Sequence, residues 1–375
     1  MLRIGIDGRA FASQAAGVRR YVNGLTRALL ALGEPLAVVA IGGRDSSALP
    51  PGVGYVAESS HPPTNLGWTL IGLPLAARRA AVDVIHAPAY TAPFWSQVPV
   101  VLTIHDVSYE LHPQWYPYRR DWARRAFYRR SAHIASHILT VSRFSASEIR
   151  LAYRIPPERM TVTPHGVDDT FTPADLGCLG ELPTGVRQPY LLHVGDLHER
   201  RNLTMLVDAV LAARRDVGGV LPALSLVLAG ADRGVGDAVS EIAAGAGAAD
   251  AVVRLGSVSE ERLRTLYRGA IALAYPSLYE GFGLPLVEAM ACGTPVIASN
   301  TASIPEVLGG AGILVDPADG QAWTNAIVNV VNSEQTRGRL RTAGLRRAAE
   351  FTWERTAKLT LGAYRRVLGG PHLGP

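Results

Sequence analysis

The stretch from Tyr275 to Pro317, with the strand that leads into it, constrains the fold more than any other part of the chain. Ala270 to Ala274 is an apolar run short enough for a buried strand. The loop Glu280 to Gly283 follows it, and then a helical pattern that Gly293 ends before a second strand at Thr294 to Ala298. Strand, glycine loop, helix and strand form a parallel crossover, which predicts an α/β fold with a doubly wound parallel sheet.

The loop has the composition of a ligand site. Gly281 and Gly283 let the backbone approach a ligand closely, and the N–H groups at a helix start attract anions. Glu280 and Glu288 would repel a phosphate, whereas their oxygens suit hydroxyl groups such as those of a ribose. The pattern indicates a sugar nucleotide. The alternative is that Glu280 ends a strand in solvent and Glu288 lies on an exposed helix face.

Length and composition indicate two globular domains. The chain has 375 residues, more than a single hydrophobic core usually serves. Of these, 48% are hydrophobic and 18% charged, which is typical of globular proteins. Residues 173–189, rich in proline and glycine, have the composition of a linker. Both halves begin with a strand, a loop and a helix, so we expect two similar domains, residues 1–175 and 176–353. Strands are predicted at 2–6, 36–41, 53–57, 82–86, 98–104, 137–141, 160–163, 190–194, 224–230 and 252–256.

Several function classes are disfavoured by what the sequence lacks. There is one lysine, Lys358, and no Gly-Lys pair, so a P-loop is absent and a lysine-bound pyridoxal cofactor has no suitable residue. No Asp-x-Asp pair and no His/Cys cluster occurs, so we expect a site that needs neither metal nor cofactor. Cys178 and Cys292 form no disulfide framework. With no signal peptide and no membrane-spanning run, the cytoplasm is the expected compartment.

Two places in the first half have the residue types of a site. Gly17 lies in the loop expected between the first strand and a helical pattern at Val22 to Leu32. It lacks the GxGxxG spacing of a dinucleotide site, so a turn and a ligand role are equally open. His105 and Asp106 end a predicted strand, where an imidazole beside a carboxylate suits hydrogen bonding or proton handling. A lone histidine is more often structural.

The net charge of +5 lies in residues 1–175, because bases and acids balance after them. The densest basic segment, YRRDWARRAFYRR, is a helical pattern whose arginines spread around the whole circumference. With nearby Trp115, Trp122 and Phe127 it suggests contact with an anionic acceptor, such as a lipid-linked diphosphate, at the inner face of the membrane. The alternative is a solvated helix whose arginines pair with acids elsewhere. No nucleic-acid-binding module accompanies it. The arginines are Arg119, Arg120, Arg124, Arg125, Arg129 and Arg130.

Taken together, several segments resemble the retaining glycosyltransferases of family 4, also called glycosyl transferases group 1. Glu280 and Glu288 in EGFGLPLVE resemble the acidic pair of that family, and EAMACGTPVIASN, SIPEV and GILVDP continue its pattern. IDGRAF, GVRRYV, TIHDVSYELHPQWYP and HERRNL resemble further segments. The resemblance spans both halves, is densest from 190 to 317, and implies the GT-B fold, with two Rossmann-like domains facing across a cleft. The closing helix, about 354–370, would then pack back on the N-terminal, acceptor-binding domain.

The resemblance also implies roles for individual residues. Arg200 and Arg201 would hold the donor diphosphate, with Arg201 where the family usually has lysine. Glu288 would hold the ribose, Glu280 would orient the sugar, and His105 would support it. The implied donor-binding residues are Gly17, Arg200, Arg201, Val258, Gly281, Phe282, Gly283, Leu284 and Glu288, and the implied catalytic residues are His105, Glu280 and Asp106.

The expected activity is transfer of a hexose from a nucleotide sugar to a hydroxyl of a glycan or lipid-linked acceptor, with retained configuration. Similarity to family members with SLYEGFGLP favours mannose from GDP-mannose, in polysaccharide biosynthesis. Because the sequence offers no nucleophilic carboxylate across the cleft, same-face attack assisted by the leaving phosphate is preferred. The alternatives are a sugar-nucleotide 2-epimerase of the same fold and an inactive nucleotide-sugar-binding subunit, which Arg201 keeps open.

Overall fold

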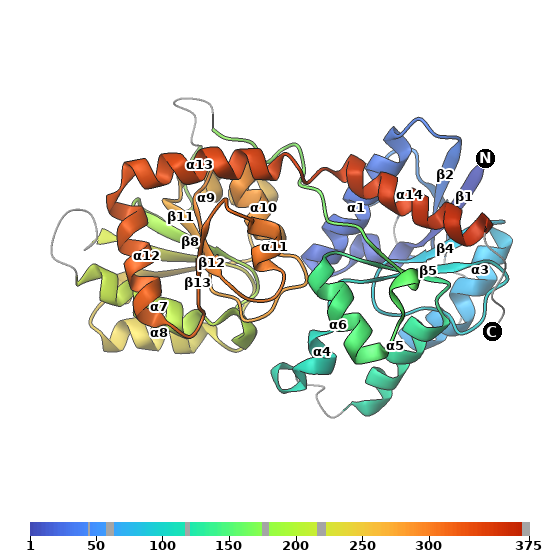
Figure 1. Cartoon of the computed structure of the whole chain (residues 1–375), viewed down its shortest axis with the longest axis horizontal. Helices are drawn as coiled ribbons and strands as arrows, with labels where there is room; N and C mark the ends of the chain where they lie inside the picture. Colours follow the sequence, from blue (N-terminus) through green and yellow to red (C-terminus); the bar gives the residue numbers. More distant parts are fainter. Residues whose placement is uncertain (44–45, 58–63, 117–120, 175–179, 216–222, 370–375) are drawn as a thin grey trace. The chain divides into compact units, whose positions relative to one another are not determined.

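The computed structural model describes residues 1–43, 46–57, 64–116, 121–174, 180–215 and 223–369. The chain forms two compact units, residues 1–166 with 352–375, and residues 167–351 (Figure 1). The sequence places the division after residue 175, which lies outside the described residues, and after residue 353. In the structure the chain enters and leaves the second unit at Val167 and Phe351, where the Val167 N–H donates to the Phe351 carbonyl at 3.0 Å.

The first unit is built on one parallel sheet of seven strands. Their order is β3-β2-β1-β4-β5-β6-β7, with the chain reversing its direction of growth between β1 and β4. That order is typical of a doubly wound sheet, in which ligands bind beyond the carboxyl ends of the strands at the reversal. The strands are β1 (Leu2–Asp7), β2 (Leu36–Ile41), β3 (Gly54–Val56), β4 (Val84–Ala87), β5 (Val100–Ile104), β6 (His137–Thr140) and β7 (Met160–Val162).

Helices cover both faces of this sheet and bury two apolar layers. One layer lies between α1 (Ala16–Ala31), the sheet and α14 (Trp353–Gly369), which packs along α1 although it closes the chain (Figure 1). The other lies under α3 (Leu73–Arg79) and α6 (Arg143–Tyr153). Within the first of these layers, the hydroxyl of Tyr364 and Nδ1 of His86 lie 2.7 Å apart, which joins α14 to the central strand β4. The remaining helices are α2 (Asn65–Gly67), α4 (Ser108–Leu111) and α5 (Trp122–Ile134).

The second unit repeats the design with six parallel strands in the order β10-β9-β8-β11-β12-β13. Here the reversal lies between β8 and β11. The strands are β8 (Tyr190–Val194), β9 (Ser225–Ala229), β10 (Val252–Gly256), β11 (Ala272–Tyr275), β12 (Val296–Ser299) and β13 (Ile313–Val315). The helices are α7 (Leu203–Arg214), α8 (Gly236–Gly245), α9 (Glu260–Gly269), α10 (Leu284–Ala291), α11 (Ile304–Leu308), α12 (Gly320–Asn332) and α13 (Glu334–Ala348).

Burial explains why these strands read as continuous apolar runs. Every residue of β8, β9, β11 and β12 is buried, as expected for parallel strands with helices on both faces. The edge strand β10, in contrast, has no fully buried residue. The α/β, doubly wound, parallel-sheet prediction is therefore confirmed for both units.

Candidate donor site

The loops after β8 and β11 lie at the reversal of the second sheet, and they carry the candidate residues. The loop after β8 leads through a short 3₁₀ turn, Glu199–Arg201, into α7. The loop after β11 leads through Glu280 into α10. Because neighbouring parallel strands end at the same edge of a sheet, residues distant in the chain meet here, such as Arg201 and Ser277, which are 76 positions apart.

Arg201 is the centre of this cluster and is 8% exposed. Its Nη1 donates to the Tyr275 hydroxyl at 2.7 Å and to Ser277 Oγ at 3.1 Å, and it is ion-paired with Glu280. The guanidinium carbon lies 5.4 Å from the centre of the Tyr275 ring, within cation–π range. A Cβ on Gly195 would lie 3.3 Å from the guanidinium, so this glycine lets the planar head pack against the backbone.

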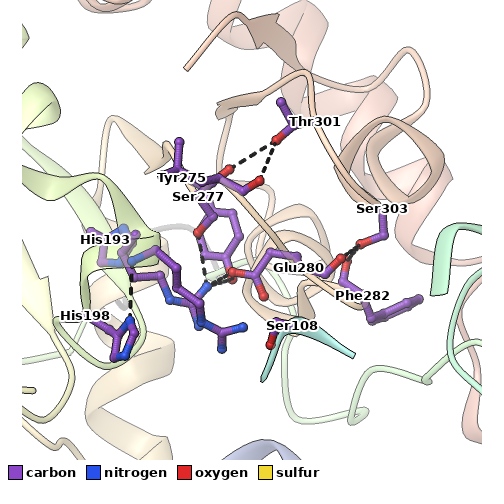
Figure 2. Close-up of polar contacts among 12 residues, drawn as sticks. Ser108, His193, His198, Tyr275, Ser277, Glu280, Phe282, Thr301 and Ser303 are labelled. Atoms are coloured by element: carbon purple, nitrogen blue, oxygen red, sulfur yellow. Dashed lines mark hydrogen bonds and ion pairs between the residues drawn. The ribbon is translucent and has the colours of Figure 1, made fainter. Parts of the chain in front are cut away.

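Glu280, like Arg201, is buried among polar partners and is 6% exposed. Its Oε1 accepts a hydrogen bond from the Tyr275 hydroxyl at 3.0 Å in addition to its pairing with Arg201 (Figure 2). Ser303 Oγ donates to the carbonyls of Glu280, at 2.9 Å, and Phe282, at 3.2 Å, which fixes the backbone of the loop (Figure 2). The alternative that Glu280 ends a strand in solvent is therefore wrong.

The glycine loop gives α10 its start. Gly283, at the N-cap, has φ of +92°, a left-handed conformation that favours glycine. Gly281, Phe282 and Gly283 are buried, Leu284 is half-buried, and Leu286 N–H already bonds back to Gly283. Because Pro285 has no N–H and the Leu286 N–H bonds to Gly283, the backbone groups that could receive an anion here are those of the loop up to Leu284.

Glu288 lies one turn further along α10 and is 2% exposed. Its Oε2 accepts a hydrogen bond from the Tyr267 hydroxyl at 2.8 Å. The alternative of an exposed helix face is thus wrong for this residue too. A carboxylate buried with a hydroxyl donor is suited to binding further hydroxyls.

His193, on β8, borders the same cluster. Its Nδ1 lies 3.1 Å from the Ala274 carbonyl, and since a carbonyl only accepts, Nδ1 carries the proton and Nε2 is an acceptor. Burial, and then the charge of Arg201, lower the pKa of His193 to about 3, so the ring is neutral. Among the described residues, neither His193 Nε2 nor Arg201 Nε has a hydrogen-bond partner.

The other candidates of this unit lie nearby in the fold but are less tightly held. Arg200 is half-buried; its N–H donates to Nδ1 of His198 at 3.3 Å and its carbonyl accepts from Leu278 N–H at 2.8 Å, which ties the two loops together. Val258 is half-buried in the loop that follows β10.

His105 and Asp106, in the first unit, follow β5 as predicted. His105 Nε2 lies 3.0 Å from the Pro88 carbonyl, so Nε2 carries the proton and Nδ1 is left as an acceptor. Burial lowers the pKa of His105 more than the Pro88 carbonyl and Asp106 raise it. Asp106 Oδ1 accepts from Ser108 N–H at 3.0 Å and Ser108 Oγ at 2.7 Å, a local turn that starts α4.

Gly17 is placed differently from the prediction. It is exposed in the first turn of α1, which begins at Ala16 and not at Val22, because the arginine-rich segment GVRRY continues the helix instead of preceding it. No atom lies within 4 Å of a Cβ built on Gly17, so the fold does not require a glycine there.

Four contributors to the cluster were not predicted. Tyr275 and Ser277 bind Arg201, Tyr267 binds Glu288, and Ser303 braces the loop. The only signal for Tyr275 is a hydroxyl-bearing aromatic at the end of an apolar strand, immediately before the loop. Tyr267 gives none, because its pairing with Glu288 depends on how α9 packs.

The basic segment of the first unit is largely paired. Arg124 pairs with Asp121 at 3.1 Å, while Arg125 and Arg129 pair with the buried Glu110 at 3.0 and 2.6 Å. Arg119 and Arg120 lie outside the described residues. Trp122, at the start of α5, is 78% exposed.

The described residues contain no group of three or more His, Cys, Asp or Glu side chains placed to hold a metal ion. Among the helices that the structure describes, none combines the length and apolar character that crossing a bilayer requires.

Comparison with known proteins identifies both halves. Residues 181–347 match the family described as glycosyl transferases group 1, and residues 15–171 match glycosyltransferase family 4. The O-antigen chain mannosyltransferase B of Escherichia coli is 34% identical over 286 residues, which are 75% of this chain and 74% of that protein. The MMP alpha-(1->4)-mannosyltransferase of Mycolicibacterium hassiacum is 32% identical over 317 residues, 78% of this chain and 73% of that protein.

The fold has solved counterparts. The structure of a sucrose-phosphate synthase from Thermosynechococcus elongatus, 22% identical, matches 98% of this chain and 100% of its own with a TM-score of 0.79. This likeness confirms the GT-B fold that the resemblance implies.

Proposed function

Because this chain belongs to glycosyltransferase family 4, we propose that it transfers mannose from GDP-mannose to a hydroxyl of a glycan or lipid-linked acceptor with retained configuration. The observation that supports this most is the buried Arg201 cluster at the sheet reversal, with Glu280 within it and Glu288 one helix turn away. Two relatives named as mannosyltransferases favour mannose.

Charge stabilisation of the leaving group is the main task of the site. Breaking the sugar–phosphate bond adds negative charge to the diphosphate, so cations and N–H donors aimed there lower the barrier. Arg201, Arg200 and the backbone of Gly281–Leu284 would supply them. These groups take the part of a metal ion, and turnover is expected to survive a chelator.

The remaining residues would hold hydroxyls. Glu288 receives the ribose, Glu280 orients the transferred sugar, and His105 offers its Nδ1 lone pair to a sugar hydroxyl. Val258 lies by the base, and Gly17 presents a helix-start amide. Glu280 is assigned to the sugar hydroxyls and the sequence offers no other carboxylate as a nucleophile, so attack on the same face of the sugar as the leaving phosphate is preferred. A covalent sugar trapped on Glu280 or Asp106 would disprove this mechanism.

A thermal-shift screen of GDP-, UDP-, ADP- and dTDP-sugars tests the donor. A ligand present at one hundred times its Kd stabilises the folded protein by about 2.7 kcal/mol. GDP-mannose is expected to give the largest rise in melting temperature, and no rise with any of the four would contradict the proposal. Conversion of the donor without an acceptor would indicate a 2-epimerase, and binding without turnover on any acceptor would indicate an inactive subunit.

We also propose that the first unit contacts an anionic membrane surface at the cytoplasmic face, where a lipid-linked acceptor would lie. Trp122, the first residue of the basic helix α5, is 78% exposed. Trp95 is 48% exposed and follows Phe94, whose ring centre lies 5.0 Å from that of Phe127 in α5. Because three of its arginines are paired with acids, the aromatic side chains carry more of this proposal than the charge does. Flotation with anionic liposomes should fall on Trp122→Ala; flotation that is unchanged in this variant and after reversal of four arginine charges would contradict it.

A further inference from the structure

The ion pair between Arg201 and Glu280 joins two residues that the proposed function assigns to different parts of the donor. Arg201 would bind the diphosphate and Glu280 would bind the sugar. Their side chains are only 10% and 8% exposed, so the pair lies out of solvent. A charge that loses its partner in such a place is strongly disfavoured.

Among the described residues, the side-chain hydrogen bonds and the ion pair of Arg201 are all made by Nη1. Nη1 serves the Tyr275 hydroxyl, Ser277 Oγ and Glu280, although it carries only two hydrogens. A phosphate oxygen that binds at Nη1 must displace one of these three acceptors, and Glu280 is the one whose negative charge repels the phosphate. A phosphate that binds elsewhere on the guanidinium still meets the negative charge of Glu280 nearby, which opposes it.

We propose that Glu280 competes with the donor diphosphate for Arg201, and that the sugar of the intact donor relieves the competition by giving Glu280 hydroxyl partners. This rests on the proposed function and adds a selectivity to it. With the nucleotide sugar, Arg201 takes the phosphates and Glu280 takes the sugar. With the nucleoside diphosphate alone, Glu280 stays charged, buried and without a substitute partner.

The consequence is preferential release of the product. Once the sugar has been transferred, Glu280 re-forms its pair with Arg201, and the nucleoside diphosphate loses its strongest cation. Tyr275 assists the exchange, because its hydroxyl contacts both side chains and can stay with either. The site thus binds the nucleotide sugar more tightly than the nucleoside diphosphate because of the charge of Glu280, and not because of the shape of the pocket.

Calorimetric titration of GDP and GDP-mannose into wild type and Glu280→Gln tests this. Glutamine keeps the shape and removes the charge, so GDP should bind at least about fivefold more tightly than to wild type. GDP-mannose should gain nothing, so the preference for it over GDP falls. Glu280→Ala must change GDP affinity in the same direction, which guards against a folding defect of one variant.

Two controls separate direct pairing from a general charge effect. Asp196→Asn removes an exposed acid that also lies near Arg201 but pairs with Arg233 at 3.1 Å, and it should leave the GDP Kd within about twofold because solvent screens it. Glu288→Gln should weaken GDP and GDP-mannose equally, because both contain the ribose.

The outcomes are distinguishable. If wild type binds GDP-mannose but Glu280→Gln binds GDP no more tightly, or more weakly, the competition is disproved while the donor site stands. If wild type binds neither ligand, the proposed function fails and this inference fails with it.

Discussion

The surroundings of Arg201 fit the planar shape of its guanidinium as well as its positive charge. Its two hydrogen bonds, its packing over Tyr275 and the space left by Gly195 all fit a planar guanidinium. Lysine would reach the diphosphate but would lose the ring contact and part of the hydrogen bonding. The departure from the usual lysine is therefore compensated locally.

For Arg201→Lys we expect roughly tenfold weaker binding of the donor and a lower melting temperature. Calorimetry and thermal unfolding measure the two effects. Arg233→Lys is the matched control, since Arg233 is 54% exposed, pairs with Asp196 and should change both much less. Donor affinity that rises in Arg201→Lys would show that lysine is the better residue here too.

At this scale the sequence predicts the charged residues and misses their partners. Glu280 and Glu288, with seven residues between them, are visible in the sequence and lie on one loop and one helix. Tyr267 is missed because α9 must pack against α10 before its hydroxyl reaches Glu288. His193 is read only as a strand residue, although it borders Arg201.

The start of α10 is the element most important for donor binding, because the left-handed conformation of Gly283 sets the direction of the backbone N–H groups there. An alanine there would be strained at φ +92°, and its Cβ would lie 2.9 Å from Cδ1 of Leu286. Gly283→Ala should destabilise the second unit by about 1–2 kcal/mol and weaken donor binding. Chemical denaturation and calorimetry give the two values.

Gly320→Ala is a suitable control, because Gly320 also begins a helix, α12, but has no atom within 4 Å of a Cβ and no positive φ. It should be neutral or slightly stabilising. Equal losses in both variants would mean that the conformation of Gly283 has no special part in the site.

Element boundaries were predicted best where turn residues bracket an apolar run. The strands at 36–41, 190–194 and 252–256 match the structure residue for residue. The strand expected at 98–104 begins at Val100, because apolar Val98 and Pro99 lie in the approach to it. The start of α1 was missed because its first turn has few apolar residues and no capping side chain.

For the whole molecule, buried neutral histidines set the response to acid. Burial is the main cause that lowers the pKa of His86 and His193 to about 3 and of His137 to about 4, and it also lowers those of His105 and His165. The unfolded chain titrates near pH 6.5, so below that pH it binds protons that the folded protein does not. Stability therefore falls as pH falls.

Each such histidine is expected to lower the free energy of unfolding by about 1.4 kcal/mol per pH unit as the pH falls from its pKa in the unfolded chain to its pKa in the folded protein. The melting temperature should drop steadily from pH 6.5 to pH 5, before most carboxylates protonate. His137→Gln should make the melting temperature depend less on pH, because it removes one of these titrating groups. The variant should still fold, because an amide can keep the hydrogen bond to Thr161 at 2.8 Å. A melting temperature that is flat from pH 7.5 to pH 5 would contradict this account.

Arg201, Glu280 and Glu288 are proposed to hold a nucleotide sugar at the reversal of the second sheet. Calorimetric titration of GDP-mannose into wild type and Glu288→Gln measures this binding. We expect a saturable single site in wild type, and an affinity about tenfold or more lower when the ribose partner is removed. The proposal is contradicted if no sugar nucleotide binds at millimolar concentration, or if Glu288→Gln binds as tightly as wild type.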